Sequence, residues 1–434
     1  MTTPLHVAES IRPEVPLTRG PGGRILTNAS VWSPDSAWIV FDARSDVAGA
    51  VFDGRRIELL HASSGEVRLA HESLHDSCCG VATFHPQRQE ILLLQGPARP
   101  TPDWSYAPHH RHGLRVELSR PQAPSALDAR NLSAPFTPGA LRGGTHLHVW
   151  NPSGTRVSST YHDALVEPLL RDVAVSVAGA PVRVPATHPR NHDGDSFTVL
   201  VTRATATPRP GSDDLARACE EAWVGREGYR RVDGSRQRHA LAFQGQVLTA
   251  RGEIITEVFV ADLPEDLAVA GAGPLAGTLS ERPFPPAGVG IRRLTHTAER
   301  KFPGVQGPRH WLQSSPDGAR IAFLMKDENG VAQLFTISPN AENFTQVTRN
   351  VFSIASAFTW SPEGRRIAHA LDGSVCVTEV ETGVTTRLTA RSTDALWPRA
   401  EAVVFSPDGT RIAFVKTLPS PDVVANQIFV VEAK

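Results

Sequence analysis

Short runs of alternating apolar and polar residues occur along the whole chain, and they come in pairs separated by a turn. The stretch 145–160, THLHVWNPSGTRVSST, is the most complete example. In it an alternating segment leads to Pro152, Gly154 follows two residues later, and a second β-rich run extends to Thr160. Proline and glycine at this spacing are typical of a tight turn, and a period of two is typical of β-strands. The pattern therefore predicts a strand, a turn and a second strand.

We find seven copies of this pattern, and their spacing predicts the fold. The turn prolines are Pro34, Pro86, Pro152, Pro189, Pro316, Pro362 and Pro407. The last three lie 46 and 45 residues apart, which is the length of one four-stranded propeller blade. The repeat therefore predicts an all-β fold, a seven-bladed β-propeller in which residues 1–434 form a single domain.

A shorter repeat marks the places where blades end. Leu-Thr or Val-Thr pairs occur where final strands are expected, at 294–295, 347–348 and 388–389, and Leu17-Thr18 precedes the first copy of the main pattern. We therefore predict that an N-terminal strand at about 13–18 completes the last blade. Such circular closure leaves no long unpaired sheet edge.

The spacing is uneven in the middle of the chain, where 127 residues separate Pro189 from Pro316. Residues 211–224, GSDDLARACEEAWV, favour a helix, with Ser212 as the N-cap, acidic residues in the first turn and Gly225 after the end. Polar and basic residues follow up to 238. We therefore predict a short helical and loop insertion in blade four, over residues 205–238 and outside the blade core.

Composition limits the possible partners. The chain has 44 Lys and Arg against 45 Asp and Glu, a net charge of −1, so nothing favours binding to nucleic acid or to an anionic membrane. The four cysteines have no spacing that indicates a zinc site or a disulfide framework. The N-terminus has no apolar signal region and no run approaches a membrane span, so we expect a cytoplasmic protein. The composition leaves open whether the chain binds another protein.

The first strand of every propeller blade lines the central channel, so equivalent positions form a ring. His146 and His310 lie six residues before their turn prolines, as do Asn28 and Glu401. His148 lies two residues after His146, on the same predicted strand face. Converging imidazoles suit a divalent cation, so we predict that His146, His148 and His310 bind zinc or manganese. Asn28 and Glu401 are further candidate binding residues. The alternative for each histidine is a structural role, since a single histidine on an inner strand more often forms hydrogen bonds within the fold.

Other candidates have two interpretations each. Arg142 and Arg309 precede the histidine-bearing strands, and they either hold the carboxylate of an anionic ligand or are surface arginines. His109 and His110 belong to a loop that either reaches the channel mouth or lies in solvent. Trp311 is either a wall for a sugar ring or, more simply, part of the blade core.

Several strings resemble the YidR-like family of bacterial propellers. They include GVATFHP (80–86), HHRHG (109–113), APFTPGALRGGTHLHVWNPSGTRVSSTYHD (134–163) and TPRPGSDDLARACEEAWVG (207–225). The resemblance extends over nearly the whole chain and implies a propeller fold without fixing a reaction. The SPDG hairpins alone resemble TolB-like propellers more broadly.

Oligogalacturonate lyases are more distantly similar. Such propellers hold a divalent metal with an HxH pair, a histidine from another blade and a glutamine three residues before the pair, where this chain has Gly143. The similarity implies β-elimination, in which a metal and an arginine neutralise a uronate carboxylate and a base removes the neighbouring proton. We therefore consider two functions. The first is a metal-dependent carbon–oxygen lyase acting on a uronate-containing oligosaccharide or another small anion. The second is a non-catalytic TolB-like propeller that binds a ligand or a protein.

Overall fold

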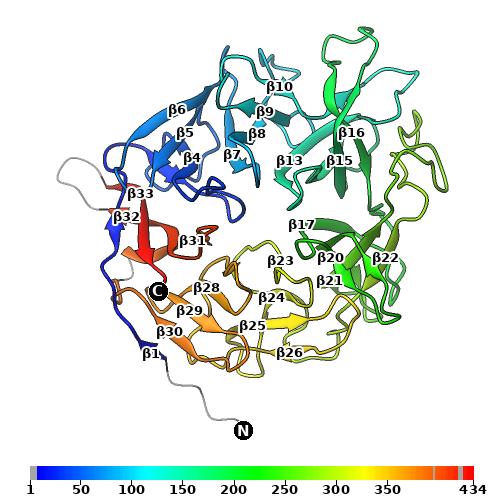
Figure 1. Ribbon diagram of the computed structural model, residues 1–434. Coiled ribbons are helices and arrows are strands. Elements are labelled where there is room, and N and C mark those ends of the chain that lie inside the picture. Colours follow the sequence, from blue (N-terminus) through cyan, green and yellow to red (C-terminus); the bar gives the residue numbers. More distant parts are fainter. Residues whose placement is uncertain (1–6, 394–395, 419–423) are drawn as a thin grey trace.

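The protein is a seven-bladed β-propeller in the computed structural model, which describes residues 7–393, 396–418 and 424–434 (Figure 1). The prediction of the fold class is therefore confirmed. Among the described residues no α-helix occurs, and accordingly none is long and apolar enough to span a membrane.

Each blade is an antiparallel sheet whose first strand lies nearest the axis. Blade one consists of β3 (Gly23–Ile25), β4 (Trp38–Arg44), β5 (Arg56–His61) and β6 (Val67–Glu72). Blade two consists of β7 (Cys79–Phe84), β8 (Glu90–Gln95), β9 (His112–Glu117) and β10 (Ser125–Ala126). Blade three consists of β13 (Gly143–Trp150), β14 (Arg156–Asp163), β15 (Arg171–Val182) and β16 (Gly194–Leu200). Blade four consists of β17 (Arg217–Trp223), β20 (His239–Leu248), β21 (Ile254–Leu263) and β22 (Gly290–Arg293). Blade five consists of β23 (Gln313–Ser314), β24 (Ile321–Lys326), β25 (Ala332–Ile337) and β26 (Thr345–Gln346). Blade six consists of β27 (Thr359–Trp360), β28 (Arg366–Leu371), β29 (Ser374–Glu379) and β30 (Thr385–Arg387). Blade seven contains β31 (Pro398–Phe405), β32 (Arg411–Leu418) and β33 (Ala425–Glu432). Two short pairs lie outside the blades, β11 (Ala129–Arg130) with β12 (Ala140–Leu141) and β18 (Tyr229–Arg230) with β19 (Arg236–Gln237).

The N-terminal segment contributes to two blades. β2 (Val15–Pro16) pairs antiparallel with β33 and is the fourth strand of blade seven, within the range given by the Leu-Thr repeat. β1 (Ala8–Glu9) pairs parallel with β30 and adds a fifth strand to blade six. Residues 8–16 therefore join blade six to blade seven.

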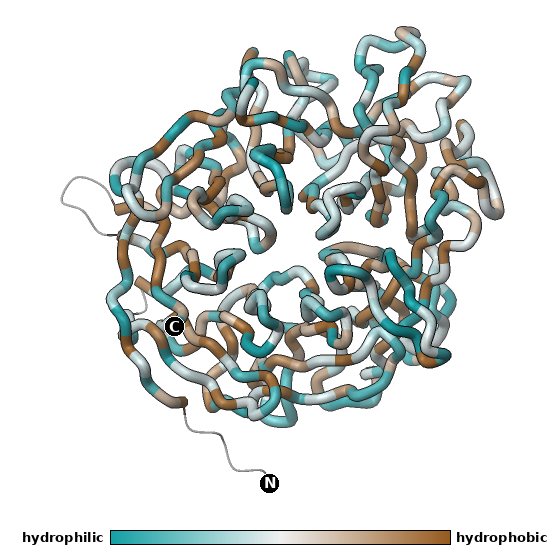
Figure 2. The backbone as a smooth tube through the Cα atoms, viewed as in Figure 1, coloured by the Kyte–Doolittle hydropathy of each residue, from teal (hydrophilic) through white to brown (hydrophobic). Residues whose placement is uncertain are grey.

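The repeated turn motif stabilises both the hairpin and the contact between blades. In three hairpins the serine hydroxyl donates a hydrogen bond to the aspartate carboxylate two residues later, at 2.5–2.6 Å: Ser33 to Asp35, Ser315 to Asp317 and Ser406 to Asp408. The tryptophan before the turn donates its indole N–H to a carbonyl of the preceding blade: Trp32 to Val404, Trp223 to Val149 and Trp360 to Gln313. Apolar clusters fill the spaces between successive blades, and hydrophilic stretches lie mainly in the connecting loops (Figure 2).

Blade four corrects two predictions. The predicted helix over 211–224 is wrong, because Arg217–Trp223 is the innermost strand, β17, and pairs with β20 from Arg217 opposite Gln246 to Trp223 opposite Leu241. Its acidic residues imitate a helix start, but burial inside the ring favours the strand, since tertiary context overrides local propensity. The Pro189 copy also does not begin a blade, since it lies in the connection between β15 and β16 of blade three. Between β17 and β20 the chain inserts only the β18–β19 hairpin.

Candidate functional site

The innermost strands of blades two, three and four share a β-bulge. Val81, Leu147 and Glu220 have φ angles of 57°, 50° and 50°, and each lies within a register shift of its strand. A bulge places two residues opposite one and interrupts the alternation of side chains. His146 and His148 flank the residue with positive φ, so the predicted sharing of one strand face does not hold for them.

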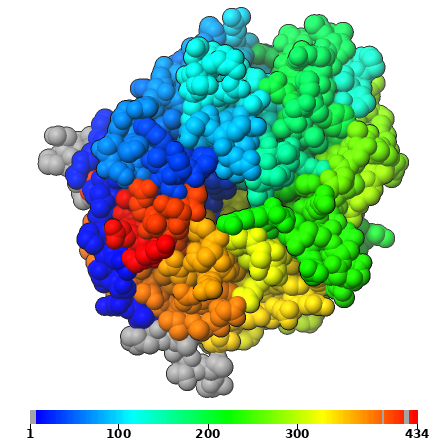
Figure 3. Space-filling model, in the orientation of Figure 1, coloured from blue at the N-terminus to red at the C-terminus, as the bar shows by residue number. Residues whose placement is uncertain are grey.

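His146 faces the central channel. It lines a cavity of about 460 Å³ together with Arg309, Trp311, Glu401 and Tyr106. The lining comes from several blades around the axis, so this cavity, which we call the channel mouth, belongs to the channel itself. Side chains cover much of the central opening on the face shown in Figure 3.

The channel mouth is strongly basic around His146. Burial is the largest cause that holds the pKa of His146 well below its usual value, and Arg111, Arg171 and Arg309 lower this pKa further. Arg171 and Arg309 both face the Glu220 carboxylate, at 3.8 and 2.9 Å. Arg111 donates to the Thr145 carbonyl and the Tyr106 hydroxyl, and within the described part of the chain it has no carboxylate partner. Two of the three guanidinium groups thus share one carboxylate, and the third, Arg111, pairs with neutral oxygens.

His148 lies away from this cavity. It is 1% exposed, and its Nε2 lies 2.9 Å from the Thr145 hydroxyl oxygen. The ring rests against Gly113 of β9, where a Cβ atom would approach His148 Nε2 to 2.8 Å. Burial lowers the pKa of His148 to about 3. This histidine is therefore a neutral packing residue between blades two and three.

Both ring nitrogens of His310 already have partners. The backbone N–H of Leu324 donates to Nε2 at 3.2 Å, and Nδ1 lies 2.8 Å from the Pro308 carbonyl, so Nδ1 carries the proton. Burial lowers the pKa of His310 to about 4. Metal binding would have to break one of these two hydrogen bonds inside blade five.

The three histidines do not fit the predicted metal centre. His310 has no free nitrogen, His148 lies away from the channel mouth, and the arginines around His146 repel a cation. Across residues 7–393, 396–418 and 424–434, no group of three or more His, Cys, Asp or Glu side chains is placed to hold a metal ion.

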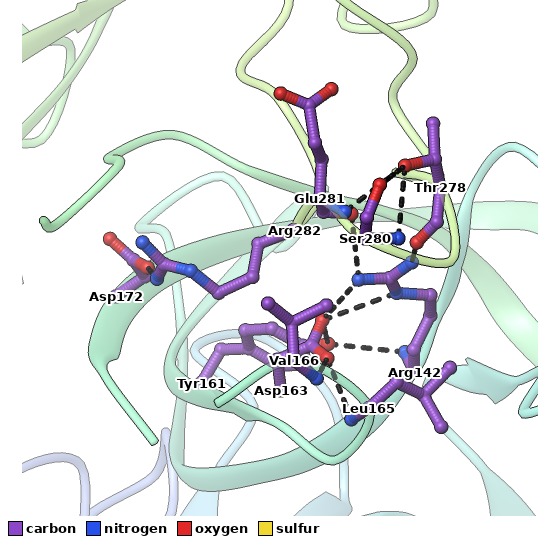
Figure 4. A network of polar contacts seen from close by, with 10 residues as sticks. All are labelled: Arg142, Tyr161, Asp163, Leu165, Val166, Asp172, Thr278, Ser280, Glu281 and Arg282. Atoms are coloured by element: carbon purple, nitrogen blue, oxygen red, sulfur yellow. Dashed lines mark hydrogen bonds and ion pairs between the residues drawn. The ribbon is translucent and has the colours of Figure 1, made fainter. Parts of the chain in front are cut away.

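Arg142 has a structural position instead of the predicted ligand contact. It is fully buried, and its Nη2 lies 2.9 Å from the Asp163 carboxylate, which also accepts from the Tyr161 hydroxyl (Figure 4). The guanidinium also donates to the carbonyls of Thr278 and Glu281, in the long connection between β21 and β22. Arg142 therefore fastens that connection to blade three and is unable to reach a ligand in the channel.

The remaining candidates divide between the channel and the packing of loops. Trp311 and Glu401 line the channel mouth; the Arg309 guanidinium lies 4.7 Å from the Trp311 ring centre, and Glu401 pairs with Arg399 at 2.9 Å. Trp311 is only partly buried, so its interpretation as pure core is incomplete.

Asn28 is buried and donates its amide N–H to the Phe358 carbonyl at 3.0 Å. His110 stacks on Trp104 at 3.6 Å and bonds the Ser105 carbonyl, and His109 packs edge-on to it at 4.1 Å. These two histidines therefore hold their own loop together.

Two residues beside His146, Arg171 and Glu220, were not predicted from the sequence. Arg111 belongs to the HHRH loop of His109 and His110, which the sequence already offered as a candidate for the channel mouth. Glu220 lies in the segment assigned to a helix, and Arg171 begins the third strand of blade three without any motif around it. Only the assignment of β17 as an innermost strand could have placed Glu220 in the ring.

Together the fold and this cavity define a class, the seven-bladed β-propellers with a charged cavity on the central axis. The chain belongs to the YidR family. It is 42% identical over 409 residues to the "Uncharacterized protein YidR" of Escherichia coli (strain K12), and the aligned region covers 92% of this chain and 94% of that protein. The family described as "Protein of unknown function (DUF3748)" matches residues 78–192.

Solved structures of similar shape include two oligogalacturonate lyases. One, in complex with manganese, has a TM-score of 0.58 at 11% identity and covers 100% of this chain and 97% of its own. The other, from Vibrio parahaemolyticus, has a TM-score of 0.55 at 11% identity, with coverage of 100% and 98%. At this identity the likeness shows the fold alone. A putative TolB from Agrobacterium tumefaciens gives a TM-score of 0.40 at 14% identity, covering 87% and 98%.

Proposed function

We propose that the channel mouth binds a small carboxylate-bearing ligand, with uronate-containing oligosaccharides as the class. The observation that supports this is the cluster of Arg111, Arg171 and Arg309 around His146, in which Glu220 pairs with Arg171 and Arg309 and no described carboxylate pairs with Arg111. An added carboxylate would balance this charge, and guanidinium groups bind carboxylates through two parallel hydrogen bonds. Trp311 supplies an aromatic surface against which a sugar ring can lie.

Carbon–oxygen lyase chemistry is the second candidate, and the state of His146 favours it. Its depressed pKa keeps the imidazole unprotonated at neutral pH, so it can accept a proton. Arginines on the uronate carboxylate make the adjacent C–H more acidic. His146 then takes that proton, the electron pair of the C–H bond forms a C=C bond, and the C–O bond to the leaving sugar breaks. The leaving oxygen takes up a proton from the imidazolium of His146, directly or through water, and His146 is regenerated. The two lyases of similar fold are consistent with this chemistry.

No step of this proposal passes through a metal. One of the two lyases is in complex with manganese, but His146, His148 and His310 do not fit a shared metal centre in this chain. Charge neutralisation is therefore assigned to the arginines alone. The non-catalytic binding propeller is the outcome if the ligand binds and no product forms.

Calorimetric titration with uronate oligosaccharides of defined length tests the binding. Arg309→Gln is the variant of choice, because this side chain is 57% exposed and Arg309 lies outside the blade strands. A hydrogen bond to a charged group contributes about 1.5–3 kcal/mol, so affinity should fall by about ten- to a hundredfold. Arg68→Gln, on the outer strand of blade one, is the control and should bind like the wild type.

Product formation separates the two candidates. The unsaturated uronate formed by elimination absorbs in the ultraviolet, and His146→Ala should abolish this signal while Arg309→Gln weakens it through binding. Wild-type protein that binds no uronate overturns the whole proposal. Wild-type protein that binds without forming product leaves the binding propeller as the function.

A further inference from the structure

A second chamber lies along the same channel. It has a volume of about 280 Å³, and Trp311 lines both this inner chamber and the channel mouth. Glu221 and Asn28 face it, together with Trp223 and Trp360. Among the described residues that line it there is no Lys, Arg or His, so its chemistry is opposite to that of the basic mouth.

The inner chamber presents buried oxygen atoms without partners. Glu221 is 2% exposed, and neither of its carboxyl oxygens has a hydrogen-bond partner in the described structure. Asn28 is fully buried; its amide N–H is used by Phe358, but its Oδ1 is also unpartnered. A buried acceptor left without a partner costs about 1–3 kcal/mol, so these atoms are expected to meet a donor.

The tryptophans of the chamber complete the environment. The indole N–H groups of Trp223 and Trp360 are already donated to backbone carbonyls of the preceding blades. What these side chains offer the chamber is therefore aromatic surface, which attracts organic cations. We propose that the inner chamber binds an alkylammonium group, with Glu221 as the counter-charge, Asn28 Oδ1 as a hydrogen-bond acceptor and tryptophan rings as the wall.

The electrostatics of Glu221 agree with this assignment. Its pKa is raised to about 8, mainly by burial and also by the neighbouring Glu220, whereas Arg171 and Arg309 lower it. Both of these guanidinium groups face Glu220, at 3.8 and 2.9 Å, and thus are largely compensated. The empty chamber therefore holds a protonated Glu221 at neutral pH, and a bound ammonium group displaces that proton. Affinity should rise with pH, by up to about tenfold per unit below pH 8.

Titration calorimetry with methylammonium chloride tests the proposal, with potassium chloride as the control for ionic strength. The wild type should bind methylammonium saturably at pH 8 and about fivefold more weakly at pH 7, because Glu221 is half ionised at its pKa of about 8. Binding should release a proton, seen as a heat that depends on the buffer. Glu221→Gln should weaken binding at least tenfold and remove its pH dependence. Glu253→Gln, an exposed carboxylate on the turn between β20 and β21, is the matched control and should change nothing.

Two results would overturn the assignment: no saturable binding by the wild type at pH 8, or an unchanged pH profile in Glu221→Gln. The wild-type pH series decides the matter even if the variant folds poorly. The inference is independent of uronate binding, because methylammonium carries no carboxylate and no arginine lines the inner chamber among the described residues. Saturable, pH-dependent binding of methylammonium by the wild type therefore supports it even if no uronate binds.

Discussion

Replacing Arg142 by Met tests whether the buried network of Figure 4 is structural. The substitution leaves the Asp163 carboxylate buried, with the Tyr161 hydroxyl and two backbone N–H groups as its remaining partners. It also removes the side-chain donor of the Thr278 carbonyl and leaves the Glu281 carbonyl with the backbone N–H of Thr278. Breaking one partner of a buried ion pair costs about 3–5 kcal/mol. Unfolding entropy of about 2.1 cal/mol/K per residue gives about 0.9 kcal/mol/K for this chain. The expected fall in Tm is therefore about 3–5 °C.

Thermal melts followed by circular dichroism measure this shift. Arg251→Met is the matched control, because Arg251 and Glu299 are 68% and 81% exposed and such a pair contributes at most about 1 kcal/mol. Adding Asp163→Asn to Arg142→Met should recover part of the loss, since it removes the uncompensated charge. If Arg142→Met instead keeps the wild-type Tm and loses uronate binding, Arg142 is a ligand residue and our structural interpretation fails.

Three further outcomes are expected. Deleting residues 1–20 should lower Tm markedly, because β1 and β2 pair with β30 and β33; an unchanged melt would contradict this. The free energy of unfolding should fall as pH drops from about 6.5 towards 4, because the unfolded chain takes up protons that the buried histidines refuse. Burial lowers the pKa values of His148, His310 and His369 to about 3, 4 and 4, and each contributes about 1.4 kcal/mol per pH unit; melts in a pH series check it. The Tm of Glu221→Gln relative to the wild type should rise progressively from pH 5 to pH 8. The reason is that folded wild-type protein keeps the Glu221 carboxyl protonated up to about pH 8, whereas the unfolded chain releases this proton; equal Tm differences at both pH values would contradict it.

The sequence predicts what local chemistry determines. The serine, proline, aspartate and glycine of the hairpins form their turns through contacts two residues apart, as between Ser406 and Asp408, so copies of the motif could be counted directly. Blade four was misassigned because β17 carries Glu220 and Glu221 at buried positions, where only the ring explains them. Local propensity has no access to such tertiary burial.

The site was harder to predict than the fold. Period-two alternation placed His146 and His148 on one face, and the bulge at Leu147, with its φ of 50°, has no signal in the residue type. The basic cluster depends on arginines from different blades, which are brought together only when the ring closes. The hydrogen bonds that occupy His310 are likewise contacts with backbone groups, and a side-chain pattern does not report these.

The N-terminal segment has a consequence for the order of folding during synthesis. It is synthesised before the blades, yet its partners come after them: the Thr18 hydroxyl accepts from the backbone N–H of Ile428, 410 residues further along the chain. The segment must therefore stay unpaired while the seven blades are translated, and the apolar side chain of Val15 lacks its partner strand until β33 has been synthesised. Nascent chains truncated before β33 are expected to expose this segment to proteases and chaperones, so the slowest step of maturation should be the final closing of the ring.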